Sequence, residues 1–230
     1  MKNIAIITAR GGSKRIPKKN IKEFMGKPML AYAIQAAQDS KIFDEVMVST
    51  DSEEIAEIAR KFGANVPFMR SEATANDYAT TAEVLNEVIE RYKKQGKTFD
   101  EFCCIYPCVP FLTGEILKNA YKNFKESNAA TLMPVVRFSF PIQRAVRINN
   151  NGFLEYREPE NAPKRSQDFE PMYHDVGMFY FTKTDKFIEE KTLVCKNTIM
   201  LEMDERFIQD IDTLEDWKMA ELKYKVLHNA

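Results

Sequence analysis

The sequence predicts an α/β protein in which a mostly parallel sheet is flanked by helices on both faces. Short apolar runs alternate with segments of helical period through the first two-thirds of the chain, which is the pattern of consecutive β-α units. The 230 residues are 44% hydrophobic and contain no composition break that would mark a linker, so we expect a single domain. Residues 137–172 interrupt the alternation and are expected to form a small inserted arm.

The positions of the elements follow from the spacing of apolar residues, which differs between strands and helices. Strands are predicted at about residues 3–8, 45–50, 64–69, 101–106 and 130–136. Helices are predicted at about residues 28–39, 52–62, 80–95 and 113–127. This order indicates a Rossmann-like sheet, in which ligands bind beyond the carboxyl ends of the strands.

Residues at the predicted helix starts support these boundaries. Asp51 precedes Glu54 by three residues, and Thr80 precedes Glu83 by three, which is the spacing of a capping box. Pro28 suits a position in a first helical turn. The starts of the first three predicted helices are therefore supported by local signals as well as by periodicity.

The pattern changes after residue 137. A hairpin is predicted at about residues 142–156, turning through Asn150-Asn151-Gly152. The chain then returns with apolar runs at Val176 to Phe181 and Thr198 to Met203, followed by a last helix from about residue 213 to 228. The interruption is therefore expected to leave and rejoin the same sheet.

Charge and hydropathy exclude several classes of function. A net charge of -1 argues against a surface that binds nucleic acid, so the partner should be small. The longest apolar stretches are far shorter than the ~20 residues that a membrane span needs, and the first residues show no signal-peptide pattern. We expect a cytoplasmic protein that binds no membrane.

The four cysteines do not predict a metal site or a disulfide framework. Cys103, Cys104, Cys108 and Cys195 have no zinc-binding spacing, and the chain contains two histidines. Cys103 and Cys104 are adjacent in a strand, so their side chains should point to opposite faces as buried, reduced thiols. A reactive Cys108 at the wall of a site is the alternative.

The loop after the first strand carries the clearest functional signal. Its five cations are Arg10, Lys14, Arg15, Lys18 and Lys19, and Gly11-Gly12 allows a tight turn and a close approach to a ligand. The spacing is neither a Walker A loop nor GxGxxG, so side-chain cations should hold most of a polyphosphate. The alternative is a basic, solvated loop.

Two carboxylates near the end of the chain form a second group. Asp210 and Asp212 flank Ile211, and in an extended segment they would face one way with the isoleucine buried behind them. Mg²⁺ is typically held by one or two carboxylates together with substrate phosphates. In the alternative interpretation, Asp212 caps the last helix and Asp210 is solvated.

A third group lies between the strand predicted to end at residue 69 and the following helix. Arg70, Asp77, Thr80 and Thr81 could contact a nucleobase, because hydroxyls at a helix start and a guanidinium offer hydrogen bonds to its edge. The alternative is that the threonines cap the helix.

A fourth group is expected to bind the acceptor substrate. Lys164 and Arg165 could pair with a carboxylate, while Gln167, Tyr173 and His174 could bond hydroxyl or amide groups. An ordinary strand-entry pair of His174 with Asp175 is the alternative.

These groups together resemble the CMP-sialic acid synthetases over nearly the whole chain. The matching motifs are Ala9-Arg10-x-x-Ser13-Lys14-x-Ile16-Pro17-x-Lys19-Asn20, Ser49-Thr50-Asp51, Arg70 to Thr81, and Asp210-Ile211-Asp212-Thr213. Within that family, Arg165-Ser-Gln167-Asp168, Tyr173-His174-Asp175-x-Gly177 and the segment Gln209 to Asp216 look most like the pseudaminic acid cytidylyltransferases of bacteria that glycosylate flagellin.

The resemblance implies transfer of a cytidylyl group from CTP to the anomeric hydroxyl of a nine-carbon 2-keto acid sugar, with release of pyrophosphate. It implies a homodimer, with residues 137–172 as the dimer contact, and Mg²⁺ or another divalent cation such as Mn²⁺. The roles carried over are phosphate binding and catalysis by Arg10, Lys14 and Lys19, nucleotide contacts around Ala9, Ser13, Asn20, Arg70, Asp77, Thr80 and Thr81, and metal binding by Asp210 and Asp212.

Two departures from the sialate pattern bear on the acceptor. Tyr106 stands where a glutamine is usual, and His174 stands where an arginine is usual. Both positions line the sugar pocket in the family, so N-acetylneuraminic acid is the less favoured acceptor and pseudaminic acid the favoured one. The alternatives are another nonulosonic acid such as legionaminic acid, a nucleotide-sugar glycosyltransferase, or a CTP-binding sensor without catalysis.

Overall fold

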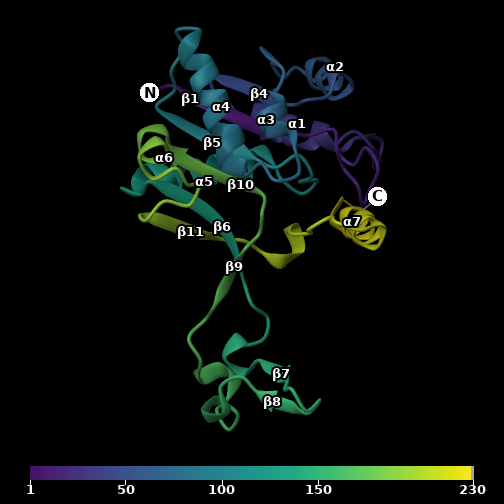
Figure 1. Ribbon diagram of the computed structural model, residues 1–230, viewed down its shortest axis with the longest axis vertical. Helices are drawn as coiled ribbons and strands as arrows, with labels where there is room; N and C mark the ends of the chain where they lie inside the picture. Colours follow the sequence, from purple (N-terminus) through teal and green to yellow (C-terminus); the bar gives the residue numbers. More distant parts are fainter. Residues whose placement is uncertain (229–230) are drawn as a thin grey trace.

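A computed structural model describes residues 1–228. The fold is organised around one seven-stranded sheet (Figure 1). Its strands are β1 (Asn3–Thr8), β4 (Glu45–Ser49), β5 (Glu101–Ile105), β6 (Thr131–Arg137), β9 (Tyr173–Asp175), β10 (Phe179–Lys183) and β11 (Thr198–Glu202). The order is β4-β1-β5-β10-β6-β11, with β9 also paired to β6. Only β9 and β10 run against the other five, so the expected mostly parallel sheet is confirmed.

Helices cover both faces of this sheet. They are α1 (Met29–Ser40), α2 (Glu53–Lys61), α3 (Glu72–Ala75), α4 (Thr81–Lys94), α5 (Gly114–Glu126), α6 (Thr184–Glu190) and α7 (Leu214–His228). Alternate side chains of β1 enter separate cores: Ala5 and Ile7 pack with α1, α2 and α5, whereas Ile4 and Ile6 pack with α4 and α6. The adjacent Cys103 and Cys104 divide between the same two cores, as their alternation in the strand predicts.

The predicted strand at residues 64–69 is wrong. Asn65 forms an isolated parallel bridge with Met47, donating to the Val46 carbonyl and accepting from the Val48 amide. The next rung of such a ladder would need an N–H at residue 67, which is a proline and has none. The segment therefore leaves the sheet after one bridge and continues as a loop to Arg70.

Two of the predicted helix starts are corrected. Ser52, not Asp51, caps α2 by accepting from the Ile55 amide, so the helix begins one residue later than a box at Asp51 would require. Pro28 precedes α1 rather than lying in its first turn. The predicted capping box of Thr80 and Glu83 is confirmed in both directions.

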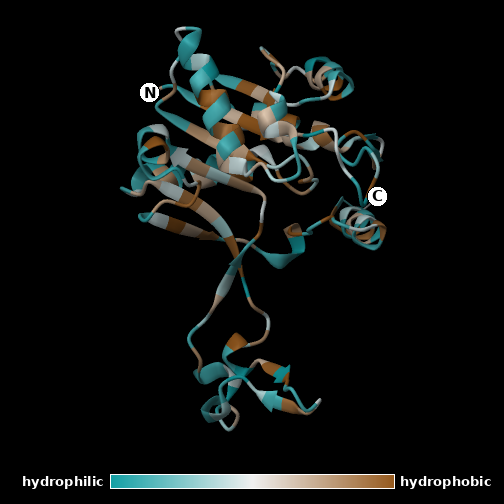
Figure 2. Ribbon diagram, in the orientation of Figure 1, coloured by the Kyte–Doolittle hydropathy of each residue, from teal (hydrophilic) through white to brown (hydrophobic). Residues whose placement is uncertain are grey.

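An arm, residues 138–172, leaves the sheet after β6 and returns at β9, projecting from the body in Figure 1. It contains the hairpin of β7 (Val146–Ile148) and β8 (Leu154–Tyr156), so the predicted hairpin is confirmed with shorter strands. Figure 2 shows hydrophobic residues on β7 and β8. The side chains of Phe140, Ile148 and Phe153 are 82%, 75% and 70% exposed. This apolar exposure is large for so small a segment.

A third core fixes the carboxyl-terminal segment to the start of the chain. Ile16 and Phe24, from the loop after β1 and the short ribbon of β2 (Glu23–Phe24) with β3 (Lys27–Pro28), pack against Ile211 and Trp217. Phe24 meets Trp217 edge to face with ring centroids 5.4 Å apart. Among residues 1–228, no helix combines the length and apolar character needed to cross a membrane.

Candidate active site

The candidate site lies where the order of the strands along the chain reverses. The chain passes from β1 outward to β4 and then back to β5 on the other side of β1, so the loops after β1 and β5 diverge around a crevice. A cavity of about 560 Å³ occupies this place. Its lining combines Arg10, Ser13, Lys14, Arg15, Lys19, Asn20, Arg70, Asp77, Thr81, Tyr106, Cys108, Asp210 and Asp212 with neighbouring residues. Three of the four groups picked out by the sequence therefore meet in one cleft.

The cationic loop, residues 9–20, is held by its own polar contacts. Asn20 is buried and donates from Nδ2 to the Arg10 carbonyl at 2.8 Å, while the Cys108 thiol donates to its Oδ1 at 3.3 Å. Gly11 donates its amide to Asp51 at 2.8 Å, and a Cβ at Gly11 would come within 3.1 Å of Ser52. The close approach at Gly11 is therefore to the start of α2, whereas the sequence predicted a close approach to a ligand.

Cys108 is not activated as a nucleophile. Burial raises the pKa of its thiol to about 12, and the nearby Lys19 opposes this only in part. The thiol therefore keeps its proton at neutral pH, and its role in this geometry is to orient Asn20.

Asp77 pairs with two cations of the loop. Its carboxylate lies 2.7 Å from Arg10 Nη1 and 2.5 Å from Lys14 Nζ, and all three side chains are well exposed. The bonds from Lys14 and Arg10 hold the pKa of this carboxyl below its usual range. An anion that enters the cleft would compete with Asp77 for these cations.

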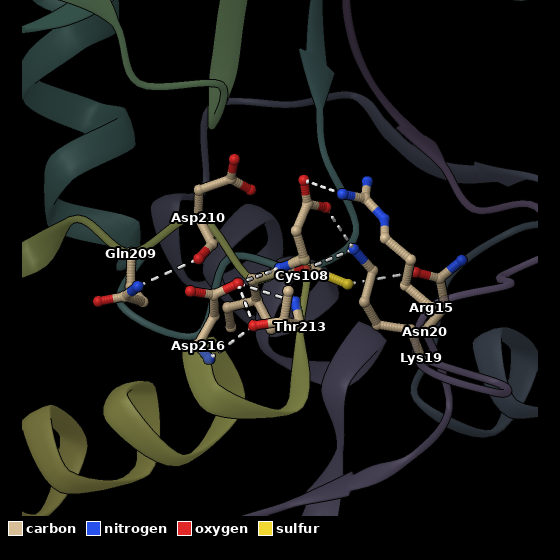
Figure 3. A network of polar contacts seen from close by, with 10 residues as sticks. Arg15, Lys19, Asn20, Cys108, Gln209, Asp210, Thr213 and Asp216 are labelled. Atoms are coloured by element: carbon tan, nitrogen blue, oxygen red, sulfur yellow. Dashed lines mark hydrogen bonds and ion pairs between the residues drawn. The ribbon is translucent and has the colours of Figure 1, made fainter.

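Asp212 pairs with two further cations of the loop. Arg15 Nη1 lies 2.8 Å and Lys19 Nζ 3.5 Å from its carboxylate, and Lys19 also donates to the Ile211 carbonyl at 2.6 Å. Figure 3 shows Arg15 and Lys19 reaching toward the segment that precedes α7. The loop after β1 and the segment before α7 thus meet around one point.

Asp212 does not cap α7, which removes the alternative interpretation of this residue. Thr213 and Asp216 form the cap instead: the Asp216 amide donates to the Thr213 hydroxyl, and the Asp216 carboxylate accepts from the Thr213 amide. The same carboxylate accepts from the Asp212 amide at 3.1 Å. The cap therefore fixes the backbone on which Asp212 is carried.

The donor set around Asp210 and Asp212 fits a magnesium ion that completes its shell from substrate and water. Both carboxylates line the cleft, Ile211 is buried behind them, and the Asp210 carboxylate points away from Thr213 and Asp216 in Figure 3. Within residues 1–228 no cluster of three or more acidic, histidine or cysteine side chains could hold an ion alone. Two carboxylates facing a phosphate site are what Mg²⁺ commonly uses.

Arg70 is built into the wall of the cleft. It is 9% exposed, donating to the Ser49 carbonyl at 2.6 Å and to the Ser49 hydroxyl at 3.1 Å. Burial lowers the pKa of its guanidinium, and the nearby Asp51 and Glu87 oppose this. Thr81 lies 3.3 Å from the Tyr106 hydroxyl in the same wall, whereas Thr80 is occupied by the cap of α4.

A second cavity of about 580 Å³ adjoins the first and shares Tyr106, Cys108, Gly177 and Asp210 with it. His174 also lines it, with Nδ1 3.0 Å from the Asp175 carbonyl. Arg165 and Gln167 lie in the arm instead, where Gln167 lines a separate hollow of about 370 Å³. Tyr173 lies in β9 opposite Arg137, at the base of the arm. A single chain thus does not bring the predicted acceptor residues together.

Sequence reasoning missed several residues of the two cavities. Arg15 was counted among the loop cations but received no role, although it makes the shortest ion pair to Asp212. Asp175 accepts from the Tyr180 hydroxyl at 2.5 Å and from the Gly177 amide at 2.8 Å, which orients the wall of the second cavity. The motif Tyr173-His174-Asp175-x-Gly177 signalled this carboxylate, whereas Lys223 and Glu205 carried no sequence signal.

Comparison with known proteins identifies the family. The model of a family described as cytidylyltransferase matches residues 4–216. This chain belongs to the cytidylyltransferase family. It is accordingly a nucleotidyltransferase, and the cleft described above is the candidate active site of that activity.

Relatives of this cytidylyltransferase match it along its whole length. It is 41% identical over 230 residues to the pseudaminic acid cytidylyltransferase of Campylobacter jejuni, covering 100% of this chain and 99% of that protein. It is 31% identical over 229 residues to the CMP-N,N'-diacetyllegionaminic acid synthase of Legionella pneumophila, covering 96% and 95%. A solved CMP:2-keto-3-deoxy-manno-octonic acid synthetase in complex with CTP has the same fold, with a TM-score of 0.70, 17% identity and full coverage of both chains.

Proposed function

We propose that this enzyme transfers the cytidylyl group of CTP to the anomeric hydroxyl of pseudaminic acid, giving CMP-pseudaminic acid and pyrophosphate. The observation that carries the proposal is the meeting of Arg10, Lys14 and Lys19 with Asp210 and Asp212 in one cleft that continues into a second cavity. The 41% identity to a protein of that name supports the choice of acceptor.

In this reaction the sugar hydroxyl oxygen bonds to the α-phosphorus while the bond to the departing pyrophosphate breaks in line with it, and the hydroxyl proton passes to water or to a nearby carboxylate. Arg10, Lys14 and Lys19 would bind the phosphates and neutralise the charge that builds on the leaving group, and Arg15 joins them by position. A divalent cation held by Asp210 and Asp212 would supply Lewis-acid stabilisation of the same oxygens when bound. Arg70, Asn20 and Thr81 would position the nucleoside, with Ser13 beside them in the cleft lining. Ala9 is buried beneath the loop and Thr80 caps α4, so both would shape the site from behind, while Asp77 would release Arg10 and Lys14 to the phosphates.

The acceptor would occupy the second cavity. Tyr106 stands at the junction of the two cavities, so a group bound beside it lies next to the cleft that would hold the triphosphate. Tyr106 and His174 both replace residues usual in sialate enzymes, which supports pseudaminic acid over N-acetylneuraminic acid. We also propose that the reaction takes place in the cytoplasm and that its product serves flagellin glycosylation. The second point is supported by a relative 30% identical over 229 residues, the post-translational flagellin modification protein B of Campylobacter coli.

The enzyme would act as a homodimer joined through the arm. Phe140, Ile148 and Phe153 expose apolar surface that a second copy would cover. Arg165 and Gln167 lie in that arm, so they would reach the acceptor in the partner's cavity rather than in their own.

A pyrophosphate-release assay with CTP and a panel of 2-keto nonulosonic acids tests the proposal. We expect turnover with pseudaminic acid to exceed that with legionaminic or N-acetylneuraminic acid. Preference for another panel member would reassign the acceptor, and CTP binding without pyrophosphate release from any of them would favour a sensor.

A further inference from the structure

A separate cavity of about 160 Å³ lies on the face of the sheet that α4 and α6 cover. Its walls come from β1, β5, α4, α6 and the loop between α4 and β5, and it shares no lining residue with the two cavities of the candidate active site. The lining comprises Ile4, Ile6, Val88, Ile89, Tyr92, Lys93, Lys97, Thr98, Phe99, Phe102, Thr184 and Ile188. Most of these side chains are aliphatic or aromatic, so the interior is apolar.

One polar group in this lining has no partner. Thr184 is 9% exposed, and its Oγ1 is buried without a hydrogen bond to any atom of residues 1–228. A buried hydroxyl left unpaired is destabilising, and such groups are rare in folded proteins. Its neighbours Phe102 and Ile188 are apolar and offer it no side-chain acceptor.

The volume and the single hydroxyl define a ligand class. An apolar cavity of about 150 Å³ accommodates a molecule the size of benzene. Two lysines belong to the lining: Lys97 pairs with Glu45 at 3.2 Å, and Glu45 also accepts from the Tyr92 hydroxyl, whereas Lys93 is exposed to solvent. We propose that this cavity binds a small neutral molecule with a flat apolar body and one hydrogen-bonding group, which pairs with Thr184.

The cavity and the active-site cleft share one helix. Thr81 at the start of α4 lines the cleft, while Val88 and Ile89 line the cavity about two turns further along. A molecule that shifts the second half of α4 would therefore change the wall of the nucleotide site. This part of the inference rests on the proposed function of the cleft, and it makes the cavity an effector site.

Phenol and toluene form a matched pair of probes, because they differ by a hydroxyl in place of a methyl group. Binding is measured by calorimetry and by chemical shifts of α4 and α6 amides. We expect the intact protein to prefer phenol, Thr184→Ser to keep this preference, and Thr184→Val to lose it by about tenfold in phenol affinity. Equal effects of both substitutions, or no binding of either probe, would overturn the site.

The link to the nucleotide site is tested separately with Ile89→Phe, which fills the cavity from its half-buried side. We expect phenol binding to disappear in this variant while CTP still binds. In the intact protein, saturating phenol should change the affinity for CTP by some factor, and saturating CTP should change the affinity for phenol by the same factor. Phenol binding with unchanged CTP affinity would overturn the effector role. Failure of CTP to bind at all would instead count against the proposed function.

Discussion

Asp212 is the residue on which the proposed chemistry depends most directly. Its carboxylate is held by Arg15 and Lys19 and lines the cleft beside Asp210. Replacing it with asparagine keeps the shape but removes the charge that would hold a divalent cation. We expect Asp212→Asn to lower the rate of pyrophosphate release by about a hundredfold or more at millimolar Mg²⁺.

A matched control for this substitution is Asp204→Asn. Asp204 pairs with Arg206 in the short turn before the cleft and does not line either cavity of the site. Its loss should leave the rate and the Mg²⁺ requirement close to those of the parent enzyme. Near-normal turnover of Asp212→Asn would remove the metal assignment.

Asp77 gives a second prediction, of opposite sign. Because it neutralises Arg10 and Lys14 in the open cleft, it competes with a triphosphate for both cations. We expect Asp77→Asn to lower the KM for CTP by about two- to fivefold, since exposed ion pairs have modest effects. Steady-state kinetics at low and high salt would check this, and the gain should shrink as salt screens the charges. A raised KM would mean that Asp77 contacts the nucleotide directly.

Sequence reasoning located the chemical groups at this scale better than their partners. The binding roles of the loop cations and of the paired acids could be predicted, because their residue types and spacing limit what they can bind. The ion pair of Arg15 with Asp212 was not, because it joins residues 197 positions apart whose meeting depends on packing of Ile16 against Ile211. Asp51 likewise has cap spacing, yet it binds the Gly11 amide instead.

At the scale of elements, the start of α7 both caps a helix and positions Asp212. We expect Thr213→Ala to destabilise the protein by about 1 kcal/mol through loss of the cap. The same change should raise the Mg²⁺ concentration needed for half-maximal activity, because the Asp216 carboxylate that binds the Asp212 amide loses its anchor. Thermal unfolding and a Mg²⁺ titration would measure the two effects.

Thr113→Ala separates these two effects. Thr113 caps α5 by accepting from the Ile116 amide at 3.2 Å, and it lines neither cavity of the site. Its loss should cost similar stability with no change in the Mg²⁺ requirement. An equal shift in both variants would show that the change follows from stability alone.

Glu87 ties α3 to α4 behind the nucleotide site. It accepts from the Ser71 amide and hydroxyl at 2.9 and 2.8 Å and from the Thr74 hydroxyl. Burial raises the pKa of this carboxyl, but these bonds outweigh it and lower the pKa overall. A carboxyl whose pKa is lowered by folding stabilises the protein at pH values above its unfolded-state pKa, about 4.3. This stabilisation is lost as the pH falls through the folded-state pKa.

We therefore expect Glu87→Gln to be less stable than the parent at pH 7, with a difference that shrinks as the pH falls below about 4.3. The KM for CTP should rise severalfold with little change in kcat, because Thr74 lies in the cleft lining. Unfolding measured between pH 7 and pH 3 would check the first point. Glu90→Gln, on the same helix, is the matched control, and an equal pH dependence in both would contradict the assignment.

Element positions were largely predictable, since periodicity reports burial on a sheet or a helix. The errors occurred where one residue overrides the pattern. Pro67 ends an otherwise strand-like segment after a single bridge. Gly177, with a φ of +61°, lies near the start of the apolar run Val176 to Phe181, and β10 begins only at Phe179. The antiparallel direction of β10 was not readable either, because it depends on the arm that returns the chain from the far end of β6.

At the scale of the whole molecule, the arm decides whether the acceptor site is complete in one chain. Arg165 and Gln167 lie in the arm, whereas Tyr106 and His174 line the cavity of the body. If all four contact one acceptor, the site must combine the body of one copy with the arm of another. A homodimer is then needed for activity as well as for covering Phe140 and Ile148.

Mixing two inactive variants tests this arrangement. The Asp212→Asn variant has an impaired body and an intact arm. The Arg165→Ala variant has an intact body and an impaired arm. A mixed dimer would contain one intact site, made from the body of the second variant and the arm of the first. After random reassociation, about a quarter of the parental pyrophosphate release should return. Mixing either variant with itself is the control, with light scattering to follow assembly. If mixed dimers form and activity stays at the level of the separate variants, each chain must build its acceptor site alone.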